Sequence, residues 1–469
     1  MRGKQSKIKR QKAKVGKKGI HPLFLPFAFC LLPFAFPFSA AAASPPVERS
    51  TLPNGALLLV SEQHGVPLVV VQILVDAGSR RDPAGKEGLA GLTSDLLTEG
   101  TKRRTETQIS EAADFIGASL DTGADTDYAT LSLVALSKDL DTGLDLLTDI
   151  LQHPTFPDAE VARRREAALA TIKADEDEPG KVAHRAFLKA LFRDGPYGHP
   201  VIGTADGVRR LQRSDVLAFY AAHYRPERAI ITIAGDVSAA DIASRLQTTL
   251  RDWSGADAPA FVYPDTPPVA GRTVAIEKPI SQANIILGHR GVARENPDYY
   301  ALTVMNFVLG GGGFTSRLLD NIRTKGGLAY SVGSMFTVNK APGNFEVVMQ
   351  TKNASANDAI GRACTEIERI RREAVSDDEL AGAKLYLTGS FPLRLDTTTK
   401  IAGFLTQVEF FNLGANYADT YAQRINAVTK DDVLRVAQQY LHPDQLLLVA
   451  VGDLEQAKIP ATLPCATTQ

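Results

Sequence analysis

Two kinds of hydrophobic pattern run along the chain, and together they predict a mixture of strands and helices. Continuous apolar runs that are typical of buried strands occur at four places: 69–78, 230–236, 283–291 and 447–453. Amphipathic patterns that are typical of helices occur at 105–118, 140–151 and 377–390, and the last begins with the acidic cap S-D-D-E at 376–379. The succession predicts an α+β fold in which each sheet is covered on one face by helices.

The pattern occurs twice. In each copy a helix leads through a proline turn into an apolar strand that ends in Gly-Asp. Asp215, Pro226, Gly235 and Asp236 map onto Asp432, Pro443, Gly452 and Asp453 with one offset of 217 residues. The starts of the copies agree with an offset of 214, which places Asp82-Pro83 opposite Asn296-Pro297. So long a period indicates a domain duplication and not a solenoid.

The duplication predicts two homologous domains, each with a mainly antiparallel sheet. We call residues 48–255 the first half and residues 272–460 the second half. The segment between them, 256–271, is rich in proline and alanine and is predicted to be a linker.

Composition and charge narrow the classes of function. The 469 residues are enough for more than one domain, and the net charge is −1. Residues 1–47 hold nine basic residues and no acidic ones, so the remainder has 43 basic against 53 acidic residues, a net charge of −10. An acidic chain is a poor candidate for nucleic-acid binding, and we expect no nucleic-acid partner.

The start of the chain has the three parts of a secretory signal peptide. A basic segment precedes the apolar run 23–38, and small residues with an A-x-A pattern follow at 39–44. The alternative is a membrane-spanning helix, but Pro26, Pro33 and Pro37 interrupt the run. We therefore expect residues 1–43 to be a signal peptide, the protein to be exported to the periplasm, and the mature chain to hold no integral membrane segment. After cleavage Cys364 and Cys465 would remain, and no disulfide is predicted between them.

The stretch 88–101 reads G-L-A-G-L-T-S-D-L-L-T-E-G-T and resembles the metal-binding helix of the pitrilysin/insulinase family of zinc peptidases, the inverzincins, which include mitochondrial-processing-peptidase-like proteins. The family frame is roughly G-x-A-H-x-x-E-H-x-x-x-x-G-T. Gly88, Ala90, Gly100 and Thr101 keep that frame. The resemblance spans about residues 48–455 and implies two related domains that face each other like a clam shell.

The zinc ligands and the general base of the family helix are absent from this stretch. Gly91 and Asp95 stand at the positions of the two zinc-binding histidines, and Ser94 stands at the position of the general base. Thr171, 76 residues after Asp95, is placed where the family has its third ligand, a glutamate. No two of the eight histidines are four apart, so none replaces the pair. We expect no metal or other cofactor in this chain, interpret Asp95 as a solvated helix residue, and do not expect hydrolysis by this chain alone.

A second family signature is intact at 309–332, L-G-G-G-G-F-T-S-R-L-L-D-N-I-R-T-K-G-G-L-A-Y-S-V. Its glycines are Gly310, Gly311, Gly312 and Gly313. We expect a helix at 316–324 and a strand at 329–336.

Arg323 and Tyr330 have the spacing of a family pair that faces the zinc. The resemblance implies that they hold the substrate backbone and stabilise the tetrahedral intermediate as donors to its oxygen. The glycines would let a peptide backbone approach closely. The alternatives are a surface charge for Arg323, packing for Tyr330 and a flexible turn for the glycines.

Retention of one half of a site and loss of the other predicts a division of labour. The first hypothesis is a zinc-less subunit of a heterodimeric exported metallopeptidase, whose homologous partner binds the zinc and whose substrate is an unfolded peptide. The alternative is a non-catalytic peptide-binding, scaffold or assembly protein of the same fold. A homodimer also stays open, and no nucleophile of another class supports a third kind of enzyme.

Overall fold

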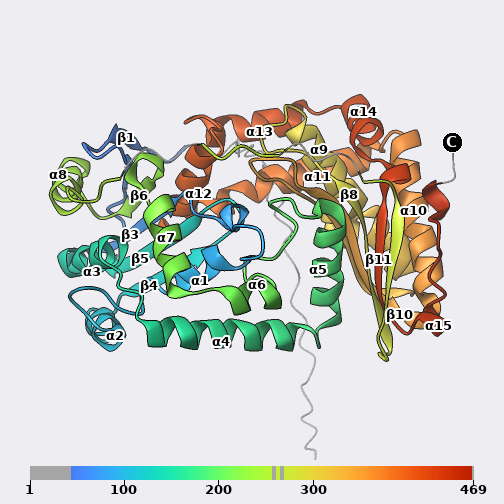
Figure 1. Ribbon diagram of the computed structural model, residues 1–469. Coiled ribbons are helices and arrows are strands. Elements are labelled where there is room, and N and C mark those ends of the chain that lie inside the picture. Colours follow the sequence, from blue (N-terminus) through green and yellow to red (C-terminus); the bar gives the residue numbers. More distant parts are fainter. Residues whose placement is uncertain (1–43, 256–259, 265–268, 467–469) are drawn as a thin grey trace, which may run out of the picture. The chain divides into compact units, whose positions relative to one another are not determined.

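The computed structural model describes residues 44–255, 260–264 and 269–466. The predicted signal peptide, 1–43, lies outside the described residues, as do 256–259 and 265–268 of the predicted linker. The described chain has an α+β fold with two mixed sheets and helices packed on them (Figure 1), which confirms the predicted fold class.

The first sheet has six strands in the order β1-β2-β6-β3-β5-β4. Neighbouring strands are antiparallel except β2 and β6, which are parallel. The strands are β1 Glu48–Thr51, β2 Leu57–Glu62, β3 Leu68–Val75, β4 Ser119–Ala124, β5 Ala129–Leu136 and β6 Ile230–Gly235.

The second sheet has five strands in the order β7-β11-β8-β10-β9, and only β7 and β11 are parallel. Its strands are β7 Arg272–Glu277, β8 Gln282–Arg290, β9 Ala329–Thr337, β10 Asn344–Lys352 and β11 Leu447–Gly452. This order repeats β2-β6-β3-β5-β4 of the first sheet, strand for strand, as expected of two copies of one ancestral unit.

The helices fill the connections between strands, and the three predicted helical segments are all helical. The segment 105–118 ends early, at Phe115, because Gly117 has a φ of +62° that a helix cannot continue through. The helices are α1 Leu89–Asp95, α2 Glu106–Phe115, α3 Leu140–Gln152, α4 Asp158–Asp175, α5 Pro179–Phe192, α6 Ala205–Arg210, α7 Arg213–His223, α8 Ala239–Thr249, α9 Tyr299–Asn306, α10 Ala356–Arg372, α11 Asp377–Gly389, α12 Thr398–Phe410, α13 Tyr417–Ala427, α14 Lys430–Tyr440 and α15 Leu454–Ala457.

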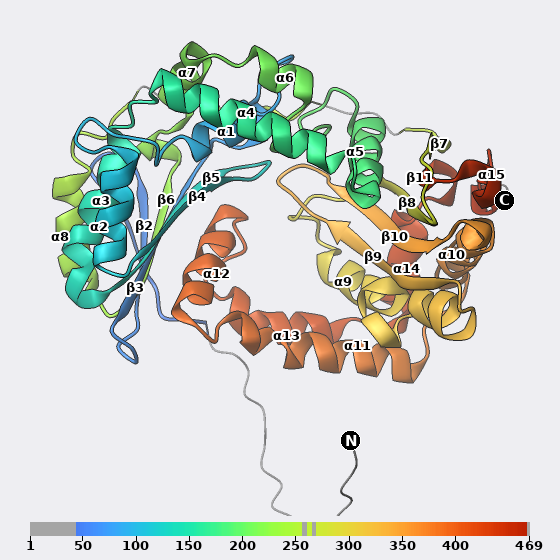
Figure 2. The same ribbon diagram turned by 90° about the horizontal axis from the view of Figure 1, so that it is seen from below.

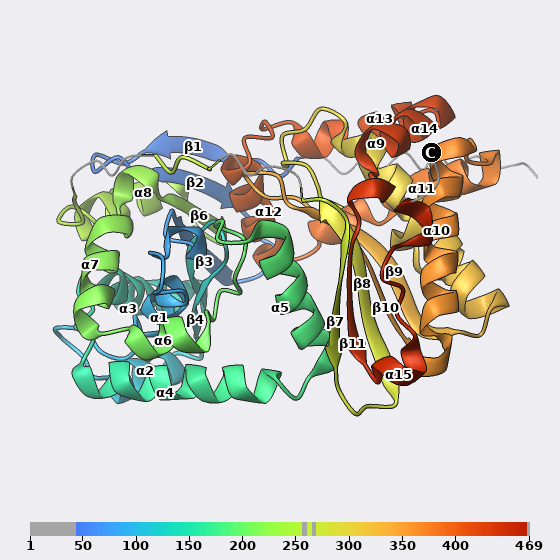
Figure 3. The ribbon, with the colours of Figure 1, turned by 45° about the vertical axis from the view of Figure 1, so that its right-hand side comes forward.

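The sheets are covered on more than the one face that the sequence led us to expect. Helix α5 of the first half packs on β8 and β11 of the second sheet (Figure 3), and α12 of the second half packs on β3 and β6 of the first (Figure 2). Phe187 of α5 is fully buried there, over the space that Gly288 leaves without a side chain. Central strands that are buried on both faces are apolar at nearly every position, which is why their runs are continuous.

A buried carboxylate also joins the halves. Asp127 accepts hydrogen bonds from Arg80 Nη1 at 2.8 Å, the Tyr197 hydroxyl at 2.9 Å, the Tyr263 hydroxyl at 3.0 Å and the backbone N–H of Lys340 at 3.0 Å. It is 3% exposed. Four donors compensate the cost of burying this charge, so the contact holds the β4–β5 turn, the loop after α5, the linker residue Tyr263 and the β9–β10 turn together.

Cys364 of α10 and Cys465 near the end of the chain form a disulfide, with their Cα atoms 5.2 Å apart. The sequence did not predict this bond, since only the fold shows that the last residues return to α10. None of the helices in the described ranges combines the length and the apolar character needed to cross a membrane.

Candidate functional site

Arg323, Tyr330 and Phe314 form one exposed cluster in the second half. The guanidinium carbon of Arg323 lies 5.0 Å from the centroid of the Phe314 ring and 5.1 Å from that of Tyr330. The rings are 75% and 77% exposed. Large aromatic side chains are seldom left so open without a contact to make, and the structure thus brings the predicted pair together and adds Phe314 to it.

The Arg323 guanidinium makes no ion pair within the described ranges. The neighbouring cation Lys325, by contrast, lies 2.7 Å from Asp320. A guanidinium has five N–H donors in a planar fork, and cation–π contacts use none of them. Arg323 can therefore donate to an acceptor that comes from outside the chain.

Local structure sets the direction of this arginine. The predicted helix at 316–324 is present, and Leu319–Lys325 of it is π-helical; the predicted strand is present as β9. The buried side chains of Leu319 and Ile322 anchor this turn to the core. A π-helical turn rotates the side chains that follow it relative to an α-helix, and such turns occur often at functional sites.

The four glycines have a packing reason that a sequence motif does not reveal. A Cβ on Gly310 would lie 2.5 Å from the backbone N of Ser334, and one on Gly312 would lie 2.7 Å from the Phe307 carbonyl oxygen. A Cβ on Gly311 would meet a side chain of α9 at 2.7 Å, and Gly313 has a φ of +57°. Residues 310–313 can thus pass close to β9 and α9. Gly311, Gly312 and Gly313 border a cavity of about 820 Å³ beside α11, whereas Gly310 is buried and does not line it.

An ion pair holds this segment to α11. Arg317 donates from Nε and Nη2 to the two carboxylate oxygens of Glu379, at 2.6 and 2.8 Å. These hydrogen bonds from Arg317 lower the pKa of Glu379 to about 2. Glu379 also accepts from the backbone N–H of Ser376 in a capping box, so the same carboxylate begins the helix and fixes the turn.

In the first half, α1 keeps the family frame, but its site positions are closed by packing. A Cβ on Gly91 would lie 2.8 Å from the carbonyl oxygen of Val201. Ser94 is fully buried, and its hydroxyl makes no hydrogen bond to the described residues. Only Asp95 is exposed. The larger histidine and glutamate side chains of the family would not fit at Gly91 and Ser94 without movement of the backbone.

The charged neighbours of Asp95 are Arg164 and Glu99, and not a histidine that could share a metal with it. Desolvation by the neighbouring protein raises the pKa of Asp95, with opposing and reinforcing contributions from Arg164 and Glu99. Glu99 is itself buried and pairs with Arg163 and with Arg164, whose Nε lies 2.6 Å from it. Glu99 is thus compensated by guanidinium groups of α4, and Asp82 accepts the backbone N–H groups of Gly88 and Ala90 at the start of α1. Among the described residues no cluster of free ligands remains around this helix.

Thr171 lies on α4, but its side chain is exposed, and its hydroxyl donates to the Ala167 carbonyl 3.1 Å away. The next residue, Ile172, is the one buried in the first-half core. Within the described ranges no three histidine, cysteine, aspartate or glutamate side chains are grouped as a metal site requires. The residues at the family's zinc positions therefore do not fit zinc.

Comparisons with known proteins agree with this fold. Residues 58–205 match the family described as "Insulinase (Peptidase family M16)", and residues 210–387 match "Peptidase M16 inactive domain". The chain is 30% identical over 402 residues to an uncharacterized zinc protease of Streptomyces coelicolor, covering 84% of this chain and 87% of that protein. An uncharacterized zinc protease of Bacillus subtilis is 24% identical over 86% of this chain and 97% of its own length.

Solved structures match over both halves. The crystal structure of a "peptidase M16 inactive domain" from Pseudomonas fluorescens superposes with a TM-score of 0.82 and 28% identity, covering 89% of this chain and 100% of that one. A protease from Helicobacter pylori gives a TM-score of 0.80 at 21% identity, over 87% of this chain and 99% of its own, which shows the shared fold. The chain belongs to the M16 peptidase family, and the predicted resemblance is confirmed.

Proposed function

We propose that the chain is the zinc-less subunit of an exported heterodimeric M16 peptidase. Its homologous partner would hold the zinc, which supplies an activated water when bound. Arg323 and Tyr330 of this chain would contribute donors to the scissile carbonyl of an unfolded peptide. The observation that carries the proposal is the Arg323 cluster: a guanidinium between two exposed rings that has no carboxylate partner among the described residues.

The chemistry of the cluster suits a peptide whose carbonyl oxygen gains charge. Guanidinium and phenol groups donate hydrogen bonds, and both are held on rigid elements, the π-helical turn and β9. Phe314 offers an apolar face beside them. Donors placed in advance stabilise the developing charge more than they stabilise the ground state, which is how they accelerate a reaction.

The disulfide supports the exported location. Disulfides persist in oxidising compartments such as the bacterial periplasm and are rare where thiols are kept reduced. Cys364 and Cys465 lie 101 residues apart, so their bond closes a long loop around the second half. Thiol titration of protein purified from the periplasm should find no free cysteine in the mature chain, and two free thiols would argue against export.

The test of the function combines the purified chain with a zinc-bearing family member from the same organism and measures hydrolysis of an unfolded peptide. We expect activity only from the mixture. Arg323→Ala should lower the turnover of the mixture by about a hundredfold, the usual effect of losing one donor to an oxyanion. Tyr330→Phe should also lower turnover, because it removes only the hydroxyl.

A matched variant keeps the test specific. Lys325→Ala changes a cation on the same turn that is already paired with Asp320. It should leave turnover unchanged. If the zinc-bearing protein is fully active alone and indifferent to this chain or its Tyr330→Phe variant, the proposal is wrong. Binding of the partner with unchanged activity for Arg323→Ala would favour the scaffold alternative.

A further inference from the structure

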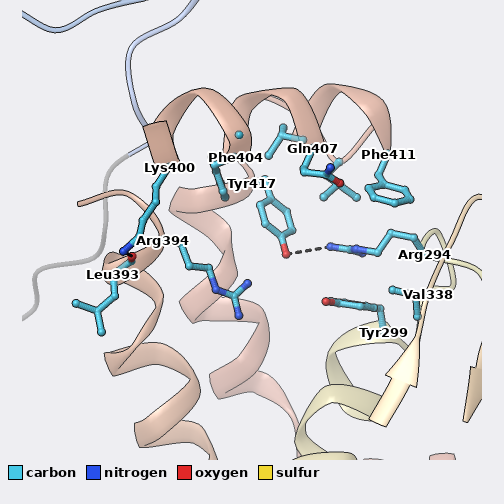
Figure 4. Close-up of a pocket in the computed structure, with 13 residues that line it drawn as sticks. Arg294, Tyr299, Val338, Leu393, Arg394, Lys400, Phe404, Gln407, Phe411 and Tyr417 are labelled. Carbon is cyan, nitrogen blue, oxygen red and sulfur yellow. Dashed lines mark hydrogen bonds between the residues drawn. The ribbon is translucent and has the colours of Figure 1, made fainter. Parts of the chain in front are cut away.

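A second cavity in the second half has walls of unusual composition. It has a volume of about 510 Å³ and lies between α12, α13, the start of α9 and the loop after β8 (Figure 4). Most of its lining side chains are aromatic or aliphatic. Among the described residues that line it, the charged ones are all cations, Arg294, Arg394 and Lys400, and none is an aspartate or a glutamate. The size is that of an ordinary small-ligand pocket.

Arg294 is the buried cation of this pocket. It is 8% exposed, and its guanidinium carbon lies 3.6 Å from the centroid of the Tyr299 ring. Its Nη2 donates to the Tyr417 hydroxyl at 2.9 Å, a contact that Figure 4 shows from the side. Within the described ranges it makes no ion pair. One of five N–H donors is therefore used, and the charge has no counter-ion among the residues that the structure describes.

The corresponding arginine of the first half shows which partners a buried guanidinium has when it is paired. Arg80 occupies the place of Arg294 under the offset of 214 residues. Arg80 pairs with Asp76 and with Asp127, and it donates to the Tyr263 hydroxyl at 2.8 Å. Both arginines are thus buried against tyrosine, but of the two only Arg80 has carboxylate partners in the described part of the chain. Burying a cation without an anion costs much free energy, so an anion from outside is the natural complement of Arg294.

The other two cations strengthen the same charge preference. Arg394 lies over the rings of Phe391 and Tyr421, at 5.4 and 5.6 Å, and makes no ion pair within the described ranges. Lys400 is paired with Asp396 at 2.8 Å. The walls next to these groups are apolar, which disfavours a fully hydrated inorganic anion. They favour a ligand with one charged end and an apolar body.

We propose that this pocket binds a carboxylate carried on a large apolar group, with the carboxylate on Arg294 and the body against the aromatic walls. The C-terminal residue of a peptide and a free aryl or branched alkyl carboxylic acid share this chemistry. The site is separate from Arg323 and Tyr330, and binding to it requires no partner subunit.

Isothermal titration calorimetry with the purified chain tests the site with defined probes. The probes are N-acetyl-Gly-Gly-Phe with a free carboxylate, the same peptide as its C-terminal amide, 3-phenylpropanoate, and acetate. We expect the free acid to bind about tenfold or more tightly than the amide, since a charge-assisted bidentate hydrogen bond is lost. Acetate should bind far more weakly, because it lacks the apolar body. Binding of the peptide acid alone would identify a chain terminus as the ligand, and equal binding of 3-phenylpropanoate would identify a small acid.

Variants locate the binding. Arg294→Met should abolish the preference for acid over amide, and Arg394→Met, at an exposed position, should reduce it. The matched control is Arg424→Met: Arg424 also donates to a tyrosine, Tyr300, at 3.1 Å, but it does not line the pocket. Equal affinity for acid and amide on the unaltered chain overturns the proposal, and this comparison needs no variant to fold. An acid preference that survives both pocket variants would overturn it as well.

Discussion

The two halves share one strand order, but Gly91 and Ser94 of the first half are packed against neighbouring atoms, whereas Phe314 and Tyr330 of the second half are exposed. On α1, Gly91 lies against the Val201 carbonyl and Ser94 is fully buried, so the positions of the family's metal chemistry are closed by the fold. Beside β9, Arg323 and Tyr330 lie open between exposed rings. A site that had decayed by neutral loss would not be expected to close in one half and stay open in the other. The difference teaches that packing decides which residues are accepted at the first site, whereas the side chains of the second site are free to contact another molecule.

The duplicated arginines give the sharpest version of this comparison and the largest expected effect. Arg80→Met should lower the free energy of unfolding by about 3 kcal/mol, because it breaks a buried ion pair. The loss stays at the lower end of the range, since Arg81 remains 2.5 Å from Asp76. Arg294→Met should cost about 1 kcal/mol or less, the worth of its cation–π contacts. Urea denaturation measures both, and equal losses would mean that Arg294 has a counter-ion after all.

The ion pair between Arg317 and Glu379, which holds the segment of the second-half site to α11, should make the free energy of unfolding depend on pH. The pKa of Glu379 is about 2 when folded, below the value of about 4.3 for a free glutamate. A lowered pKa stabilises the fold above pH ~4.3 and stops doing so as the pH falls through about 2. Glu379→Gln should therefore cost roughly 2 kcal/mol at pH 7, after a discount for the solvent that reaches the pair. The gap between variant and unaltered chain should narrow steadily between pH 4 and pH 2.5 in urea unfolding, and a constant gap would contradict the assignment.

The tight packing around α1 predicts a smaller effect on stability. Replacing a glycine by alanine should have opposite signs at two helical positions, Gly91 and Gly361. Gly91→Ala should destabilise by about 1.5 kcal/mol, because its Cβ would meet a backbone carbonyl that cannot move freely. Gly361→Ala on α10 is the control, since no atom lies within 4 Å of its Cβ position, and it should stabilise by about 0.5–1 kcal/mol. Thermal unfolding distinguishes the two signs. A stabilising Gly91→Ala would show that space for a larger side chain remains on α1.

The open cluster should be nearly indifferent to substitution when stability is measured. Arg323→Ala and Tyr330→Phe remove groups that make no ion pair or hydrogen bond in the described part of the chain, so each should change unfolding free energy by less than about 0.5 kcal/mol. Any loss of partner-dependent turnover would then come from the site and not from the fold. A large loss of stability would instead assign both residues a structural role.

Much of the architecture was predictable because local patterns are strong where burial is continuous. The Ser376 cap and the acidic start of α11 predicted that helix to within a residue, and the Gly-Asp strand ends revealed the repeat. The spacing of Arg323 and Tyr330 identified them as a pair, and the structure places their side chains together. Phe314 was missed, although an aromatic residue directly after a glycine run is a signal that could have been used. The helix expected at 316–324 is present, but no residue pattern marked Leu319–Lys325 as π-helical.

The sequence by itself determined the repeat, the sheet-and-helix class and the missing zinc ligands, because periodicity and residue identity are local properties. The tertiary structure decided that Gly91 and Ser94 are shut, that α5 and α12 each cover the other half's sheet, and that Cys364 meets Cys465. It also decided that Arg80 has carboxylate partners while Arg294 has none among residues 44–255, 260–264 and 269–466. Each of these depends on atoms far apart in the chain, and their distances are set only when the whole core has packed.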